Sequence, residues 1–181
     1  MQRRRFLIAA GWGSAGLLLP TPSHASLAPP PKEAGSPWPI LEAALTRLLP
    51  ADGDGPGAED LGAVGYLRRA LDGPRLNPDD RDLVLNGAGW LDDAARQEAG
   101  AAFTALPPAE QDAVLATIEQ SPAGERWLAR LLDFLLEAVL ADPVYGGNPS
   151  GLGWRWLHHR PGFPRPTADN TCDQLAARWR A

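Results

Sequence analysis

The side chains that could do chemistry in this chain form no complete reactive set. His158-His159 is the only histidine pair, and adjacent residues cannot supply the i, i+4 spacing that binds a metal from one helical face. The neighbouring carboxylates Asp79-Asp80 and Asp92-Asp93 would point in different directions on a helix, so they indicate solvated faces rather than an acid–base dyad. We therefore expect no catalytic, metal-binding or cofactor-binding residue in this chain.

Two local patterns imitate binding sites without meeting their requirements. The loop 51–60 is rich in carboxylates, but an EF-hand count from Asp52 places Pro56 where an oxygen ligand is needed. The run 11–16 fits the G-x-G-x-x-G nucleotide fingerprint, but it lies in an N-terminal leader and not between a strand and a helix. The chain also has no Cys-x-x-Cys-His run, so the sequence excludes covalently attached c-type haem.

The N-terminus has the three parts of an export signal. These are a basic start, an apolar stretch over 6–19 that is too short to span a bilayer, and small residues before position 26. Paired arginines at the start indicate export of a folded protein through the twin-arginine translocase. The residues assigned to this signal are Arg3, Arg4, Phe6 and Leu7. We predict a signal peptide over 1–25 cleaved between Ala25 and Ser26, and a periplasmic location; an uncleaved anchor is the alternative.

The charge balance narrows the possible partners. Removal of residues 1–25 leaves 14 basic and 22 acidic side chains, a net charge of −8. A surface this acidic repels phosphate backbones and anionic headgroups, so we expect no nucleic-acid partner and no peripheral membrane binding. The remaining length suits one domain with a single core.

Cys172 is the only cysteine in the chain. In an oxidising compartment it would have no partner within its own chain, which favours an intermolecular disulfide or a free thiol. The alternative is a small buried side chain of no chemical consequence. Cys172 is therefore a candidate for a disulfide to another subunit.

The elements that position these residues are predicted to be helical. No stretch of useful length alternates with the period of a strand, whereas apolar residues recur at helical spacing five times between proline or glycine stops. After a Pro-rich linker over 26–35, helices are expected at about 37–49, 61–71, 78–94, 109–120 and 123–141. The fold class expected for 36–181 is all-α: a small bundle of about five helices followed by a long irregular segment rich in Gly, Pro and aromatic residues.

Two packing features follow from these helices. The fifth is the most apolar, so we expect it at the centre of the bundle. Its single polar strip consists of Arg126, Arg130, Asp133 and Glu137. In the third helix, Gly87 would let a neighbouring helix approach closely while the indole of Trp90 covers the contact.

The C-terminal segment, residues 142–181, combines glycines with prolines and rigid aromatic side chains. Long irregular segments of this composition usually bind something, and aromatic side chains are typical anchors of interfaces. The candidate docking residues are Tyr145, Gly146, Gly147, Asn148, Gly151, Gly153, Trp154, Trp156, Phe163 and Pro164. The alternative is a segment that only packs over its own bundle.

The chain resembles the gluconate 2-dehydrogenase subunit 3 family, the small subunits of membrane-associated flavoprotein dehydrogenases. The likeness rests on the leader, on Leu-Leu-Pro-Ala-Asp over 48–52 with Pro-Gly-Ala over 56–58, and on Asp-Pro-Val-Tyr-Gly-Gly-Asn over 142–148. It continues through Gly-Leu-Gly-Trp over 151–154.

The resemblance implies a non-catalytic subunit that partners an FAD-binding dehydrogenase large subunit. That large subunit would oxidise a sugar, sugar acid or polyol and pass electrons to a cytochrome c subunit carrying haem c. It would lack its own export signal and travel through the twin-arginine translocase with the small subunit, and the complex would associate with the membrane. A periplasmic binding or scaffold module with a different partner is the alternative.

Overall fold

The computed structural model describes residues 35–180. The expected signal peptide and almost all of the expected linker lie outside this range. Seven α-helices and three short 3-10 helices form the described part, which contains no strand. The all-α prediction is therefore confirmed.

The five predicted helices are all present, with shifted ends. They are α1 (Trp38–Leu48), α2 (Ala63–Asp72), α3 (Pro78–Ala99), α4 (Pro108–Glu119) and α5 (Pro122–Leu140). Caps fix two of the starts: Asn77 accepts a hydrogen bond from the Asp79 amide at 3.1 Å, and Ser121 accepts one from Gly124 at 3.0 Å. The third helix continues five residues beyond its predicted end, to the left-handed Gly100.

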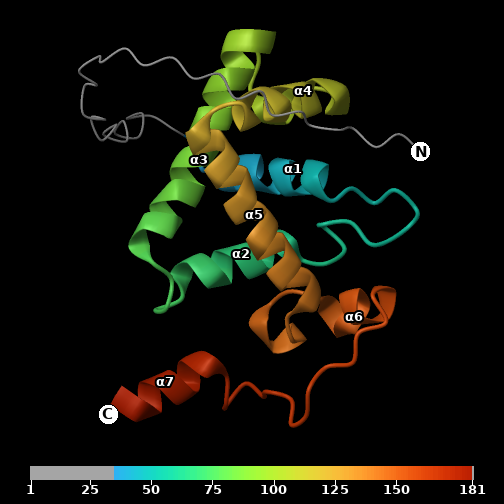
Figure 1. The fold of residues 1–181 in the computed structure, drawn as a ribbon, viewed down its shortest axis with the longest axis vertical. Helices are drawn as coiled ribbons and strands as arrows, with labels where there is room; N and C mark the ends of the chain where they lie inside the picture. Colours follow the sequence, from blue (N-terminus) through green and yellow to red (C-terminus); the bar gives the residue numbers. More distant parts are fainter. Residues whose placement is uncertain (1–34, 181) are drawn as a thin grey trace, which may run out of the picture.

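Helix α5 runs through the middle of the molecule and packs against α1, α2, α3, α4 and α6 (Figure 1). Its inner face carries Trp127 and Leu131, which are fully buried. The predicted central position of this helix is confirmed. At the edge of the bundle, Arg47 and Asp112 join α1 to α4 through two hydrogen bonds of 2.7 and 2.8 Å.

The outer face of α5 carries exposed leucines in addition to the predicted polar strip. Leu132, Leu136 and Leu140, spaced by four residues, are 43, 61 and 45% exposed. Arg130 is mostly covered: its guanidinium lies 4.3 Å from the Phe134 ring centroid. The three leucines, called the leucine stripe below, thus form a second solvent-facing row.

The packing expected at Gly87 involves a different tryptophan. The indole that covers Gly87 belongs to Trp127 of α5, and not to Trp90 one turn further along α3. The indole nitrogen of Trp127 donates to the Val84 carbonyl at 3.1 Å. A glycine can contact any helix that crosses it, so spacing within α3 could not identify the partner.

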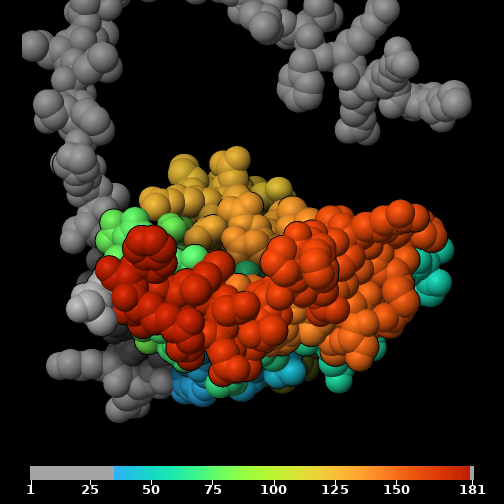
Figure 2. All heavy atoms as spheres, turned by 90° about the horizontal axis from the view of Figure 1, so that it is seen from below, coloured from blue at the N-terminus to red at the C-terminus, as the bar shows by residue number. Residues whose placement is uncertain are grey.

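The C-terminal segment contains more regular structure than its composition indicated. It has 3-10 turns at Pro143–Tyr145 and Pro149–Gly151, a short helix α6 (Leu152–Trp156) and a last helix α7 (Cys172–Arg180). Between α6 and α7 the chain is irregular. Figure 2 shows this segment spread across one face of the bundle from α6 to α7. Within the described range, no helix is both long enough and apolar enough to cross a membrane.

Candidate docking surface

Asn148 attaches the first half of the C-terminal segment to the bundle. Its side chain is fully buried, donates to the Ala141 carbonyl at 2.9 Å and accepts from the Gly153 amide at 2.7 Å. Its own amide donates to the Leu61 carbonyl at 2.8 Å. Because asparagine tolerates the left-handed φ of 52° found here, one residue joins the end of α5, the turn before α2 and the start of α6.

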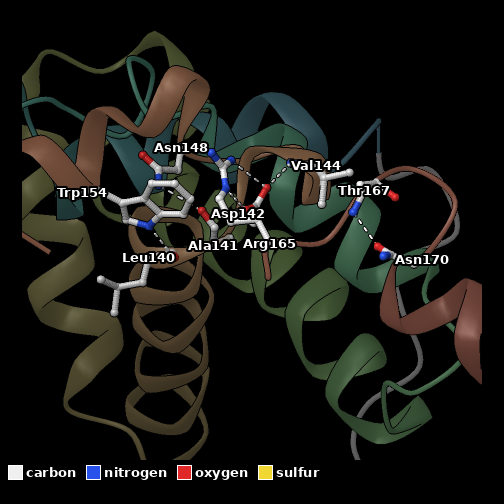
Figure 3. Close-up of polar contacts among 9 residues, drawn as sticks. All are labelled: Leu140, Ala141, Asp142, Val144, Asn148, Trp154, Arg165, Thr167 and Asn170. Atoms are coloured by element: carbon white, nitrogen blue, oxygen red, sulfur yellow. Dashed lines mark hydrogen bonds and ion pairs between the residues drawn. The ribbon is translucent and has the colours of Figure 1, made fainter. Parts of the chain in front are cut away.

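Trp154 secures the next turn. Its indole nitrogen donates to the Leu140 carbonyl at 2.8 Å, and the residue is only 8% exposed (Figure 3). Gly153 allows this contact, since a Cβ there would collide with the Val139 carbonyl oxygen. Helix α6 therefore sits on the C-terminal turn of α5, where free carbonyl groups need donors.

An ion pair between Asp142 and Arg165 joins the start of the C-terminal segment to the stretch that follows α6. The guanidinium makes two hydrogen bonds to the carboxylate, at 2.8 and 3.2 Å, and lies 4.9 Å from the Trp154 ring centroid (Figure 3). The Asp142 carboxylate also accepts from the Val144 amide at 3.1 Å. The hydrogen bonds from Arg165, and then the one from Val144, lower the pKa of Asp142, while burial opposes them.

The candidate docking residues thus divide into two groups. Gly147, Asn148, Gly151, Gly153 and Trp154 are buried, and Tyr145 is partly buried. For these buried residues the structure matches the alternative of a segment packed over its own bundle, so they are not available to a second chain. The exposed candidates are Gly146, Trp156, Phe163 and Pro164, for which docking stays a prediction.

The exposed large apolar side chains gather in one part of the chain. In the described range they all follow residue 131, on α5, α6, the irregular stretch and α7. They are Leu132, Leu136, Leu140, Trp156, Leu157, Phe163, Leu175 and Trp179. Sequence reasoning missed the leucine stripe because an apolar residue on a central helix is expected to face inward. Exposed apolar side chains that lie together in a row, as in the leucine stripe, are typical of protein–protein interfaces.

Trp156 connects this region to the carboxylate-rich loop 51–60. Its indole nitrogen donates to the Asp54 carbonyl at 3.1 Å, and a Cβ on Gly55 would collide with its ring. Within the loop, Asp52 accepts from the Asp54 amide and Asp60 from the Gly57 amide, so these carboxylates stabilise turns. No three His, Cys, Asp or Glu side chains in residues 35–180 are grouped so that they could hold a metal ion.

Cys172 is exposed at the first turn of α7, so the alternative of a buried, inert side chain is wrong. The Tyr145 hydroxyl donates to its Sγ at 3.3 Å and accepts from its amide at 3.2 Å. This hydrogen bond, helped by the nearby Arg75 guanidinium, lowers the pKa of the Cys172 thiol, against the opposing effect of burial. The arrangement favours the thiolate, the form that reacts.

A cavity of about 290 Å³ lies between α2, α5 and the C-terminal segment, and Tyr145 is among its lining residues. In its wall the Tyr66 hydroxyl donates to Glu137 at 2.9 Å. Burial, and then this hydrogen bond, raise the pKa of Tyr66. Arg75, which also lines the cavity, forms an ion pair of 3.4 Å with Asp173, so one charged contact links α7 to the bundle.

Comparisons with known proteins identify a family but no individual relative. No curated protein matches the chain, and no solved structure matches it. A family model described as Gluconate 2-dehydrogenase subunit 3 matches residues 36–162. The matched range includes α1 to α6 and ends before Phe163 and α7. The chain therefore belongs to the gluconate 2-dehydrogenase subunit 3 family.

Proposed function

We propose that this chain is the non-catalytic small subunit of an exported flavoprotein dehydrogenase. Its role is to carry the folded FAD-binding large subunit through the twin-arginine translocase and to stay bound to it. Membership of a family of dehydrogenase subunits is the observation that carries the proposal. The twin-arginine leader supports it, because folded export suits a partner that takes up its cofactor before it crosses the membrane.

The exposed apolar surface after residue 131 supports a lasting complex. The leucine stripe on α5 offers three side chains in one row, and Phe163 is 96% exposed. Burial of such apolar groups against a second chain would favour association, and the affinity is what remains after the entropy and desolvation costs of binding are subtracted. In this proposal the large subunit covers the leucine stripe together with Trp156 and Phe163.

The chemistry belongs to the partners in this proposal. FAD on the large subunit takes a hydride from a sugar, sugar acid or polyol, and electrons pass to haem c on a cytochrome subunit. The complex works in the periplasm and associates with the membrane through its other subunits. This chain supplies transport and stability.

Replacement of the two signal arginines tests the carrier role. The double variant Arg3→Lys/Arg4→Lys is co-expressed with the flavoprotein, which is then followed by cell fractionation. We expect the flavoprotein to remain in the cytoplasm, whereas the control Arg5→Lys, outside the pair, should leave export intact. Normal export of the flavoprotein with the double variant would refute the carrier role. Flavin absorbance in the purified complex separates this function from a scaffold with a different partner.

Cys172 is proposed to form a disulfide with the large subunit. Its exposure and its lowered thiol pKa support this pairing. Non-reducing electrophoresis of the co-expressed pair should show a heterodimer band that disappears with Cys172→Ser. A band at the monomer position for the native pair would reject the bridge without affecting the carrier role.

A further inference from the structure

The positive charge of the C-terminal segment is separated from the acidic remainder of the chain. Between Asp142 and Asp169 the sequence has no Asp or Glu, but it has three arginines and two histidines. This occurs in a chain whose net charge without the leader is −8. The total charge therefore conceals a local cationic region.

The fold collects these side chains around one hollow. The hollow has a volume of about 850 Å³ and lies on the outer side of α6 and the stretch that follows it. We call it the cationic hollow. Its charged and aromatic lining consists of Trp154, Arg155, His158, His159, Arg160 and Arg165. No carboxylate is among its lining residues.

A sharp turn brings the two halves of this lining together. His158 adopts a left-handed φ of 51°, and the His159 amide donates back to the Trp154 carbonyl at 2.8 Å. The chain therefore reverses directly after α6 and returns past Arg160 to Arg165. The His159 ring lies 6.4 Å from the Trp154 ring, so the turn is packed against the buried end of α6.

Two of the three guanidinium groups in the hollow, those of Arg155 and Arg160, are not neutralised by a carboxylate of the described residues. Arg165 is paired with Asp142, whose carboxylate lies behind it. Arg155 bonds only to the neutral Ser150 carbonyl, and Arg160 has no hydrogen bond or ion pair within residues 35–180. Guanidinium groups of this kind bind carboxylates in a forked geometry.

We propose that the cationic hollow binds an acidic segment of the flavoprotein large subunit, with carboxylates on Arg155 and Arg160. This inference rests on the proposed function and adds the chemistry by which the partner is recognised. Complementary charge would guide the approach of the two chains and fix their register, while the leucine stripe supplies most of the buried area. A short acidic segment suits the site because charges interact over only about 8 to 10 Å at physiological salt.

An anionic lipid surface is the other chemistry that such a region could meet, and the geometry disfavours it. The guanidinium groups line a concavity, which suits a single projecting acidic segment better than the flat face of a bilayer. The Trp156 indole nitrogen donates to the Asp54 carbonyl and the ring packs against Gly55, so this side chain is held along the loop 51–60 instead of projecting outward as a lipid anchor. The acidic remainder of the chain would also be repelled by anionic headgroups.

Binding of a defined peptide to the full mature chain tests the hollow. The probe is a fluorescein-labelled peptide of alternating Asp and Gly, compared with its Asn and Gly counterpart by fluorescence anisotropy at low ionic strength. For the double variant Arg155→Gln/Arg160→Gln we expect about a tenfold loss of affinity for the acidic peptide. Arg160→Gln alone should lower the affinity for the acidic peptide about threefold. Because Arg160 makes no hydrogen bond within residues 35–180, whereas Arg155 does, this single variant should fold normally and so tests the site even if the double variant misfolds.

The control has the same change of charge at another place. Arg81→Gln/Arg126→Gln removes two exposed arginines on α3 and α5 and should change affinity by less than about twofold. Equal losses in the two double variants, or equal binding of the Asn peptide, would overturn the proposal. It would also be overturned if the chain bound vesicles of phosphatidylglycerol and phosphatidylcholine but not the acidic peptide.

The native complex separates this inference from the proposed function. With the flavoprotein co-expressed and purified at about 0.05 M salt, where charge pairs are least screened, Arg155→Gln/Arg160→Gln should lower the yield of complex at least threefold. A complex that survives unchanged in the double variant overturns the role of the hollow and leaves the carrier role standing. Absence of flavoprotein from preparations of the native chain would instead refute the proposed function.

Discussion

The indole of Trp127 lies directly on Gly87, so α5 contacts α3 where α3 has no side chain. Trp127 is fully buried, and its nitrogen donates to the Val84 carbonyl one turn before the glycine. This pair sets how closely the central helix approaches its longest neighbour. It also anchors the end of α5 opposite to the one that carries the C-terminal segment.

Gly87→Ala should therefore destabilise the chain. The new methyl group would collide with the Trp127 ring, and overpacking of this kind lowers the free energy of unfolding by about 1 to 3 kcal/mol. Gly89→Ala is the control, because no atom lies within 4 Å of its added Cβ and the better helix propensity should raise stability by up to about 1 kcal/mol. Urea unfolding measures both variants. Stabilisation by both substitutions would contradict the close contact.

Asn148→Asp should loosen the C-terminal segment. The substitution keeps an acceptor for the Gly153 amide but removes the donor to the Ala141 carbonyl and buries a charge. We expect a loss of about 3 kcal/mol at neutral pH and faster proteolysis within 142–165. Ser150→Gly, at an exposed residue with φ of 55°, should change stability by less than about 0.5 kcal/mol. If residues 142–165 are cleaved no faster in Asn148→Asp than in the native chain, Asn148 is not the residue that attaches this segment.

Stability should depend on pH through Asp142. Its folded-state pKa lies below the ordinary value because Arg165 and the Val144 amide bond to the charged form. The stabilisation is complete above the unfolded pKa of about 3.9 and is lost as pH falls through the lower folded pKa. The difference in stability between the native chain and Asp142→Asn should therefore be present at neutral pH and decline in strong acid. Asp93→Asn, at an exposed carboxylate, is the control. A difference independent of pH would contradict this role of Asp142.

Tyr145→Phe should make the Cys172 thiol less reactive. Loss of the hydroxyl removes the hydrogen bond that most lowers the thiol pKa, so less thiolate is present at neutral pH. Alkylation by iodoacetamide, followed across pH, should slow several-fold near neutrality, with the midpoint moved upward. Tyr66→Phe, whose hydroxyl bonds to Glu137, should leave the rate unchanged. An unchanged midpoint in Tyr145→Phe would refute the effect of Tyr145.

Leu136→Glu tests the leucine stripe as the docking surface. Because this side chain is 61% exposed, the change should alter the stability of the free chain by less than about 1 kcal/mol. In a complex it would bury an unpaired carboxylate, so the yield of co-purified flavoprotein should fall at least tenfold. Ala116→Glu, at an exposed position of α4, is the matched control. Equal yields from the two variants would place the interface elsewhere.

Much of the fold could be predicted because it depends on local rules. Apolar spacing of three and four residues identified α1 to α5, and proline or glycine stops placed their ends within a few residues. The end of α3 was the exception, since residues 94–99 carry no large apolar side chain but still continue the helix to Gly100. Local pattern is a weak signal where tertiary contacts or a distant cap decide the boundary.

The site was only half predictable. Composition identified the C-terminal segment as important, but glycines and aromatic residues are equally suited to docking and to internal packing. Asn148 and Trp154 had the residue types expected of a docking surface, yet both bond to carbonyl groups at the end of α5. The leucine stripe had the composition of a core, yet it faces solvent.

The sequence by itself therefore determined the helices, the charge balance and the family, because these depend on the order of residues and on local spacing. The tertiary structure decided which apolar side chains are buried and which remain exposed. It also decided that Arg155, Arg160 and Arg165 converge on one hollow, and that Tyr145 bonds to Cys172 across 27 positions of sequence. Such contacts depend on how the helices cross, and crossing is settled by packing between residues that are distant in the chain.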